Sequence, residues 1–287
     1  MERKNQSAQA AGKAFSMEHL REMARQIRVL SLKMTAAAKS GHPGGSLSAA
    51  DIVAALYFYK MRYNPRNPKD PGRDRFILSK GHCCPAVYAA LALLGVIPEK
   101  ELMNFRKLGS MLQGHPDRNR TPGIEVSTGS LGQGFSMGAG MALAAKIDGK
   151  RHKVYVVLGD GEMQEGIVWE AFMFAAHQNL NNLVAIIDQN GCQNDSFVME
   201  TLNVYPLAPK LKAFRWNVIE IDGHDMGAIV EALDAADESE GPTAIIATTV
   251  KGKGVSFMEN DPQWHGKALN GEQLSKALKE LVYDTGS

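Results

Sequence analysis

Two oxygen-bearing side chains, Asp160 and Asn190, directly follow two apolar runs that predict consecutive strands. Such strands, joined by one crossover helix, are usually neighbours, so the two side chains are expected to meet. A carboxylate, an amide oxygen and a nearby backbone carbonyl suit Mg²⁺ or Ca²⁺. They are too few to fill the ion's shell, so a phosphate ligand is expected to complete it, reached by the backbone amides of Gly159 and Gly161. The plainer interpretation, an Asp helix cap and an Asn turn, does not account for the paired glycines.

The histidines give a second signal, because five of the 8 are adjacent to a glycine. These five are His42, His82, His115, His224 and His265. Loop histidines flanked by glycine are expected at an open cleft, where imidazole can donate to hydroxyls or phosphates. Four of them, in separate loops, favour one shared polar pocket. His224 follows Asp222-Gly223 at the start of a helix and is interpreted as a turn residue.

The elements that must position these residues alternate along the chain. Apolar, β-branched runs predict buried strands at 75–79, 153–158, 183–188, 217–222 and 243–249. Helical stretches separate most of them, which predicts an α/β fold: a doubly wound, mainly parallel sheet flanked by helices. Ligands of such sheets bind beyond the carboxyl ends of the strands. A glycine closely follows each predicted strand, as expected where backbone approaches a ligand.

Apolar spacing predicts a long first helix over 16–39. The stretch Ser40-Gly-His-Pro-Gly-Gly45 is predicted to break it, and Ser46 or Ser48 to cap a second helix from Ala49 to Tyr59. A Gly- and Ala-rich helix over 132–145 must pack closely against a neighbour. Further helices are expected at 85–94, 164–177, 225–237 and 271–283. Residues 1–15 are interpreted as a polar tail and 16–287 as a single domain.

Composition limits the function classes. The chain has 287 residues, with 32 Lys and Arg against 31 Asp and Glu. This balance gives no electrostatic case for nucleic acid or a membrane as partner, and no run approaches the ~18 apolar residues of a membrane helix. The 3 Cys lack paired spacing, which argues against disulfides or a cysteine zinc site. The N-terminal stretch has no apolar signal segment, so the expected location is the cytoplasm.

Gly159-Asp160-Gly161, followed by Asn190, resembles the thiamine diphosphate motif. In order and spacing, the remaining motifs resemble those of transketolase. They are Ser40-Gly-His-Pro-Gly44, Ser79-Lys-Gly-His82, Gly114-His-Pro116, Thr128-Gly-Ser-Leu-Gly-Gln-Gly134, Gly159-Asp-Gly-Glu-Met-Gln-Glu-Gly166 and His265-Gly266. The chain is similar to the N-terminal subunit of the split, two-chain form of that family.

The resemblance implies a role for each matching residue. The metal, Mg²⁺ or Ca²⁺, is implied to be held by Asp160, Asn190 and the backbone carbonyl of Cys192. Contacts to the cofactor, thiamine diphosphate, are implied for Gly161, His82 and His265 at the diphosphate, Leu131 at the thiazolium and Gly129 at the aminopyrimidine. A sugar channel is implied for His42, His115 and His265. Glu165 is implied to lie at a subunit interface, in a carboxylate network that links two active sites.

The resemblance also implies what a partner must add. The family's activating glutamate, the aromatic residue that stacks on the pyrimidine and the arginines that hold the substrate phosphate all lie on a second domain. The implied reaction moves a two-carbon ketol unit from a ketose phosphate to an aldose phosphate. We therefore expect activity only with a C-terminal transketolase subunit, in an assembly of two chains of each kind.

Alternatives remain open at this stage. One is another thiamine diphosphate enzyme, such as 1-deoxyxylulose-5-phosphate synthase or the alpha subunit of a 2-oxoacid dehydrogenase, although these dehydrogenases lack the full set of Gly-His pairs. Another is a non-catalytic protein that kept the fold. A third is a transketolase-like enzyme for an unusual sugar, because Asn194 stands where the family usually has an aliphatic residue that packs on the cofactor.

Overall fold

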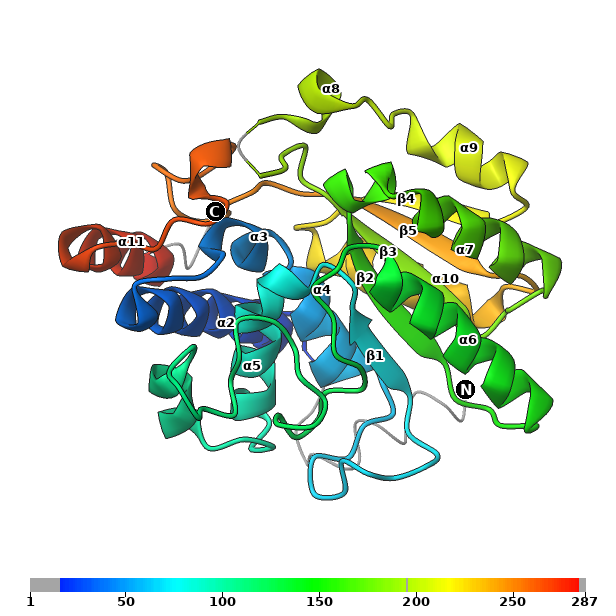
Figure 1. Ribbon diagram of the computed structural model, residues 1–287, viewed down its shortest axis with the longest axis horizontal. Coiled ribbons are helices and arrows are strands. Elements are labelled where there is room, and N and C mark those ends of the chain that lie inside the picture. Colours follow the sequence, from blue (N-terminus) through cyan, green and yellow to red (C-terminus); the bar gives the residue numbers. More distant parts are fainter. Residues whose placement is uncertain (1–15, 195, 284–287) are drawn as a thin grey trace.

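A computed structural model describes residues 16–194 and 196–283. Its centre is a sheet of five parallel strands in the order β1-β2-β3-β5-β4 (Figure 1). The strands are β1 (Arg75–Leu78), β2 (Val154–Gly159), β3 (Leu183–Gln189), β4 (Asn217–Asp222) and β5 (Thr243–Thr248). The predicted parallel α/β fold is confirmed, and β2 and β3 are neighbours, with Gly159 paired to Asp188.

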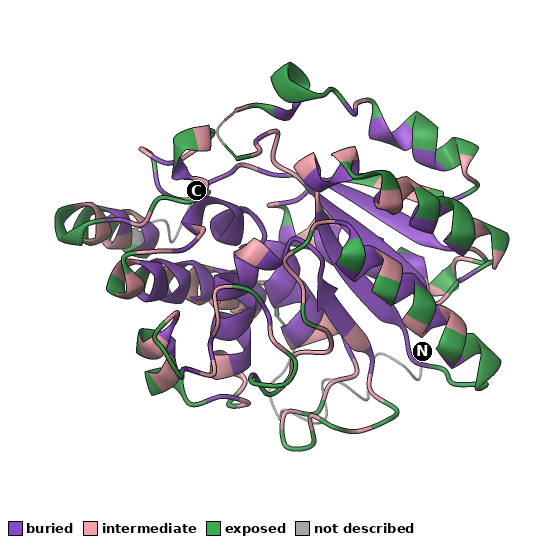
Figure 2. Ribbon diagram, viewed as in Figure 1, coloured by how far each residue is buried: buried purple, intermediate pink, exposed green. Residues whose placement is uncertain are grey.

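Alternate strand residues enter two separate cores, one on each face of the sheet. One face is covered by α2 (Met17–Ala38), α4 (Ala50–Ala55), α5 (Cys84–Leu93) and α10 (Met226–Glu238). The other is covered by α6 (Gln133–Ile147), α7 (Gly166–His177) and α9 (Leu207–Ala213). Figure 2 shows the buried strands between these layers and the exposed outer sides of α6 and α7.

A third, smaller core packs α11 (Gly271–Tyr283) and the segment before it against α2. The short elements are α3 (Pro43–Ser48), the π-helical η1 (Leu56–Lys60), α8 (Val198–Thr201) and the 3-10 turns η2 (Gly81–Cys83), η3 (Glu99–Asn104), η4 (Gly161–Gln164) and η5 (Pro262–Trp264). No described helix is long and apolar enough to cross a membrane. The tail predicted at 1–15 lies outside the described residues.

The strand β4 differs from the prediction of a buried strand. It lies at the edge of the sheet, and its residues are exposed or only partly buried. An edge strand has one neighbour and incomplete helical cover, so its apolar residues Val218, Ile219 and Ile221 are half covered while Glu220 is exposed.

The predicted break after the first helix is only partly correct. Pro43 starts the short helix α3, with its two glycines inside it. A Cβ on Gly45 would lie 2.6 Å from the Cys83 sulfur, so glycine here allows a close approach of helix and loop. The predicted serine caps are wrong, because α4 follows Ala49 without a side-chain cap. The hydroxyl of Ser46 instead donates to the His42 carbonyl.

The small-residue helix α6 packs closely on the sheet, as predicted, but along one side only. A Cβ on Gly134 would lie 2.7 Å from the Cα of Ser79, and one on Gly138 would lie 2.6 Å from a methyl of Val156. A Cβ on Gly140 would meet nothing within 4 Å. The inner face of α6 therefore has no room for a larger residue than glycine, whereas the outer face does.

This contrast predicts opposite effects of the same substitution. Gly138→Ala should lower the free energy of unfolding by about 1–3 kcal/mol, because the added methyl overpacks against β2. Gly140→Ala should raise it by about 0.4–1 kcal/mol, because alanine restricts the unfolded chain without a clash. Urea unfolding of the two variants beside the wild type measures both effects, and equal shifts would contradict this packing of α6.

Candidate active site

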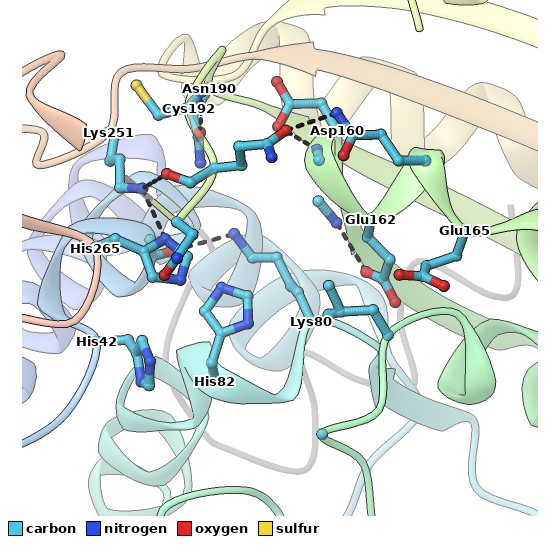
Figure 3. A pocket seen from close by; sticks show the side chains of 18 residues that line it. His42, Lys80, His82, Asp160, Glu162, Glu165, Asn190, Cys192, Lys251 and His265 are labelled. Atoms are coloured by element: carbon cyan, nitrogen blue, oxygen red, sulfur yellow. Dashed lines mark hydrogen bonds between the residues drawn. The ribbon is translucent and has the colours of Figure 1, made fainter. Parts of the chain in front are cut away.

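The predicted site residues converge at the carboxyl ends of the strands. There they line one pocket of about 410 Å³ (Figure 3). The predicted residues in its wall are His42, His82, Gly129, Leu131, Gly159, Asp160, Gly161, Glu165, Asn190, Cys192 and His265. His115 is not among the lining residues, but its ring centre lies 6.3 Å from that of His42 at the edge of the pocket. Three of the four loop histidines expected to share one polar pocket, His42, His82 and His265, therefore line it.

Asp160 is a buried carboxylate without an ion pair among the described residues. One carboxylate oxygen accepts from the Gly161 amide at 2.9 Å. The other accepts from the Gly191 amide at 2.7 Å and from the Tyr205 hydroxyl at 2.6 Å. Burial raises the pKa of Asp160, and these donors only partly offset that effect. A carboxylate in this state would gain most from a cation.

Asn190 lines the same pocket, and both ends of its side-chain amide form hydrogen bonds. Its nitrogen donates to the Ser48 hydroxyl at 3.2 Å, and its oxygen accepts from the Cys192 amide at 3.1 Å. The described residues contain no cluster of three or more His, Cys, Asp or Glu side chains that could hold a metal. Any cation here therefore depends on Asp160, on oxygens of other types and on a further ligand.

Two buried lysines in this pocket went unassigned in the sequence analysis. Lys80 follows β1 and forms an ion pair with the fully buried Asp188. Burial acts against the charge of Lys80, but the Asp188 carboxylate outweighs it and raises the pKa of Lys80 above its ordinary value. The sequence hinted at this pair, since both residues stand at the ends of predicted strands. A charged side chain at a strand end usually faces solvent, however.

Lys251 is the second of these lysines, and it is 1% exposed. Its ammonium group lies 2.9 Å from Nδ1 of His265 and 3.4 Å from the Gln193 carbonyl. In the described part of the chain it forms no ion pair. Burial lowers the pKa of Lys251.

The histidines form a compact group of neutral rings. The ring centres of His42 and His265 are 5.2 Å apart, and those of His82 and His265 are 4.9 Å apart. Burial, with nearby cations, lowers the pKa of His42 to about 4 and that of His265 to about 3. It also lowers the pKa of His82 and His115. Neutral imidazoles can both donate and accept, which suits contacts to hydroxyls.

The two glutamates of this region differ in environment. Glu162 is buried and accepts from the Ser79 hydroxyl, from the Gly132 amide at 2.7 Å and from the Gly159 amide at 3.0 Å. It links the end of β1, the start of α6 and the end of β2 by hydrogen bonds, a role that the sequence analysis did not predict. Glu165 is exposed at the start of α7 while it also lines the pocket. Asn194 is likewise exposed and lines the pocket.

The charges of the pocket fit a diphosphate bound together with a divalent cation. Lys251 supplies a buried cation and Asp160 a buried carboxylate in the same wall, and neither forms an ion pair with another described residue. Each is costly to bury alone, and a bound anion and metal ion would compensate both. Gly159 and Gly161 line the same wall, but their amides do not face a phosphate as predicted. They donate instead to Glu162 at 3.0 Å and to Asp160 at 2.9 Å.

Comparisons with known proteins show the family of this chain. The family model described as transketolase, thiamine diphosphate binding domain, matches residues 19–286. A curated relative from Clostridium sp. (strain MSTE9), the 6-deoxy-6-sulfo-D-fructose transketolase subunit SqwG, is 45% identical over 263 residues, covering 91% of this chain and 96% of the relative. Human transketolase is 41% identical over 268 residues, covering 92% of this chain but 42% of its own length.

Solved structures show the same relation. A transketolase from Campylobacter jejuni superposes with a TM-score of 0.89 at 36% identity, over 94% of this chain and 44% of its own. One from Pichia stipitis superposes with a TM-score of 0.88 at 34% identity, over 95% and 42%. The chain thus spans less than half the length of these transketolases and nearly all of the Clostridium subunit.

Proposed function

The chain belongs to the transketolase family of transferases, by way of its thiamine diphosphate binding domain, and we propose that it is the N-terminal subunit of a two-chain transketolase. The observation that carries the proposal is the single pocket in which an unpaired buried lysine, an unpaired buried carboxylate and the histidine group meet. The Clostridium relative, of matching length, is named as a subunit. We also propose that residues 16–287 act as a single domain.

The cofactor contacts follow from the charges of the wall. We assign Asp160, Asn190 and the Cys192 carbonyl to Mg²⁺ or Ca²⁺, and Lys251, His82 and His265 to the diphosphate. Gly129, Leu131, Gly159 and Gly161 complete the cradle. When bound, thiamine diphosphate supplies the carbon nucleophile that transfers a two-carbon ketol unit between sugars.

The sugar is assigned to His42, His115 and His265. Their pKa values are lowered by burial, so at neutral pH the three rings are uncharged. Arg106 approaches Nδ1 of His42 at 3.4 Å, and Lys251 approaches Nδ1 of His265 at 2.9 Å. Because these cations can only donate, both histidines keep their proton on Nε2, where it can be donated to a sugar oxygen.

The partner subunit is proposed to supply the acidic residue that activates the cofactor. Besides Asp160 and Glu162, the only acidic residue in the described wall is Glu165, which we assign to a network between two copies of this chain. Exposed apolar side chains on α6 and α7, Met137, Ile147, Met173 and Phe174, support burial of this face in an assembly. We propose two copies of this chain with two C-terminal subunits and a cofactor at each interface between unlike chains.

A ketose phosphate donor and an aldose phosphate acceptor are the proposed substrates. A sulfonated ketose is a second candidate, favoured by the similarity to the subunit named for 6-deoxy-6-sulfo-D-fructose. Both carry an anionic terminal group, so the choice between them depends on the partner's contacts. Ketol-transfer assays with fructose 6-phosphate and with its 6-deoxy-6-sulfo analogue, on the reconstituted enzyme, separate the two.

His42→Ala and His115→Ala should each lower kcat/KM by about 10–1000-fold while the cofactor stays bound, because the residues are assigned to the sugar. The reconstituted enzyme is assayed with a ketose phosphate donor, and thiamine diphosphate content is measured in the same samples. His19→Ala, a change at a half-buried histidine on α2 outside the pocket wall, is the control. Wild-type kcat/KM in both pocket variants would remove these histidines from the sugar channel.

A further inference from the structure

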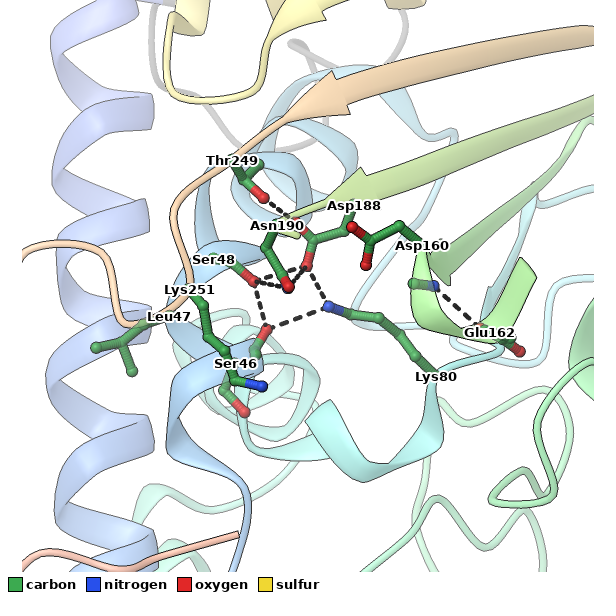
Figure 4. Close-up of polar contacts among 12 residues, drawn as sticks. Ser46, Leu47, Ser48, Lys80, Asp160, Glu162, Asp188, Asn190, Thr249 and Lys251 are labelled. Atoms are coloured by element: carbon green, nitrogen blue, oxygen red, sulfur yellow. Dashed lines mark hydrogen bonds and ion pairs between the residues drawn. The ribbon is translucent and has the colours of Figure 1, made fainter. Parts of the chain in front are cut away.

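The buried carboxylate of Asp188 is the centre of a polar network beneath the pocket (Figure 4). It lies near the end of β3 and pairs with Lys80. The hydroxyls of Ser48 and Thr249 also donate to it, the first at 2.6 Å. The network therefore joins α3 to the ends of β1, β3 and β5 in a region closed to solvent.

The Ser48 hydroxyl has one proton to donate and two possible acceptors. Its oxygen lies 2.6 Å from the Asp188 carboxylate and 3.1 Å from the Gly45 carbonyl. The charged acceptor is nearer and forms the stronger bond, so the proton lies toward Asp188. The lone pairs of the hydroxyl are then left to accept from another donor.

The amide nitrogen of Asn190 is that donor. It lies 3.2 Å from the Ser48 oxygen and 3.4 Å from Oδ2 of Asp188. A reversed amide would place its oxygen against a carboxylate and a hydroxyl whose proton is already used. The same reversal would turn the amide nitrogen toward the backbone N–H of Cys192, which now donates to the Asn190 oxygen at 3.1 Å.

We propose that Ser48, held by Asp188, is a positioning residue that keeps the amide oxygen of Asn190 facing the cation site. The inference rests on the proposed function, because it takes Asn190 as a metal ligand. The helix α3 would then position two parts of the site, since His42 immediately precedes it and Ser48 ends it. Fixing a ligand through an outer partner is a common way to tune a metal site.

The test compares Ser48→Ala with Ser46→Ala. Ser46 is equally buried on the same helix, but its hydroxyl donates to the His42 carbonyl and does not contact Asn190. Mn²⁺ is titrated into the full chain with inorganic diphosphate present, and free Mn²⁺ is followed by electron paramagnetic resonance. Ser48→Ala should weaken Mn²⁺ binding by about 10–100-fold, the usual effect of losing an outer partner. Ser46→Ala should leave it within the error of the wild type.

A second readout needs no metal. In asparagine-labelled chain, the side-chain amide protons of Asn190 should exchange slowly with solvent in the wild type and in Ser46→Ala. They should exchange faster in Ser48→Ala, where only the 3.4 Å contact to Asp188 remains. If Ser48→Ala fails to fold, Ser48→Cys provides the same comparison, because its thiol is a weak acceptor.

The outcomes separate the inference from the function on which it rests. Equal Mn²⁺ affinity and equal amide exchange in the Ser48 and Ser46 variants would overturn the role of Ser48 and leave the proposed function intact. A wild-type chain that binds no Mn²⁺ with diphosphate would overturn the metal assignment, and the role of Ser48 with it.

Discussion

Asp160→Ala is expected to abolish magnesium-dependent binding of thiamine diphosphate. Asp160 is the only anionic side chain assigned to the cation, and the surrounding amides of Gly161 and Gly191 cannot replace it because they are donors. The loss should exceed the ~100-fold that removal of an outer partner can cost a metal site. Calorimetry of the cofactor binding to the reconstituted enzyme, at fixed Mg²⁺, measures it.

Asp222→Ala is the matched control, because Asp222 also ends a parallel strand but is exposed and lies outside the pocket wall. Its affinity for the cofactor should equal that of the wild type. Since burial raises the pKa of Asp160, protons should compete with the metal at a higher pH than for an ordinary carboxylate. Unchanged cofactor affinity in Asp160→Ala would show that the cation, if bound, is held elsewhere.

The strands and most helices were predictable because each leaves a periodic apolar pattern. The pattern shows that a segment is apolar but not where its strand lies in the sheet, so the edge position of β4 was missed. It also failed at α3, where Pro43, Gly44 and Gly45 usually signal a break. Gly45 lets this helix approach Cys83 closely, a contact between segments far apart in the sequence.

The candidate site was predictable where residue types and spacing carry the chemistry, as with Asp160, Asn190 and the Gly-His pairs. Lys80 and Lys251 were missed for a physical reason. A lysine in a sequence is by default solvated, and only the folded chain shows that these two are each 1% exposed. Asp188 and Lys80 both stand at the carboxyl ends of predicted strands, but only the folded chain shows that they form an ion pair.

The chain on its own is expected to show no ketol transfer, and activity should appear only with a C-terminal subunit. The pocket wall among the described residues has three acidic side chains. Asp160 is assigned to the cation, and Glu162 is occupied by three donors from loops of its own chain. Glu165 remains, but it is exposed at the start of α7, beside the apolar face assigned to a second copy.

The test is a coupled ketol-transfer assay on the purified chain with thiamine diphosphate and Mg²⁺, with and without the C-terminal subunit, beside light-scattering mass measurements of the same samples. Met173→Glu is a useful variant, because Met173 is 50% exposed on α7 and a charge there should block burial of that face without disturbing the fold. It should keep the unfolding behaviour of the wild type but lose mass in the assembly and lose turnover. Robust turnover by the lone chain would contradict the two-chain proposal, because the described wall would then have to provide every proton transfer through Glu165 or the histidines.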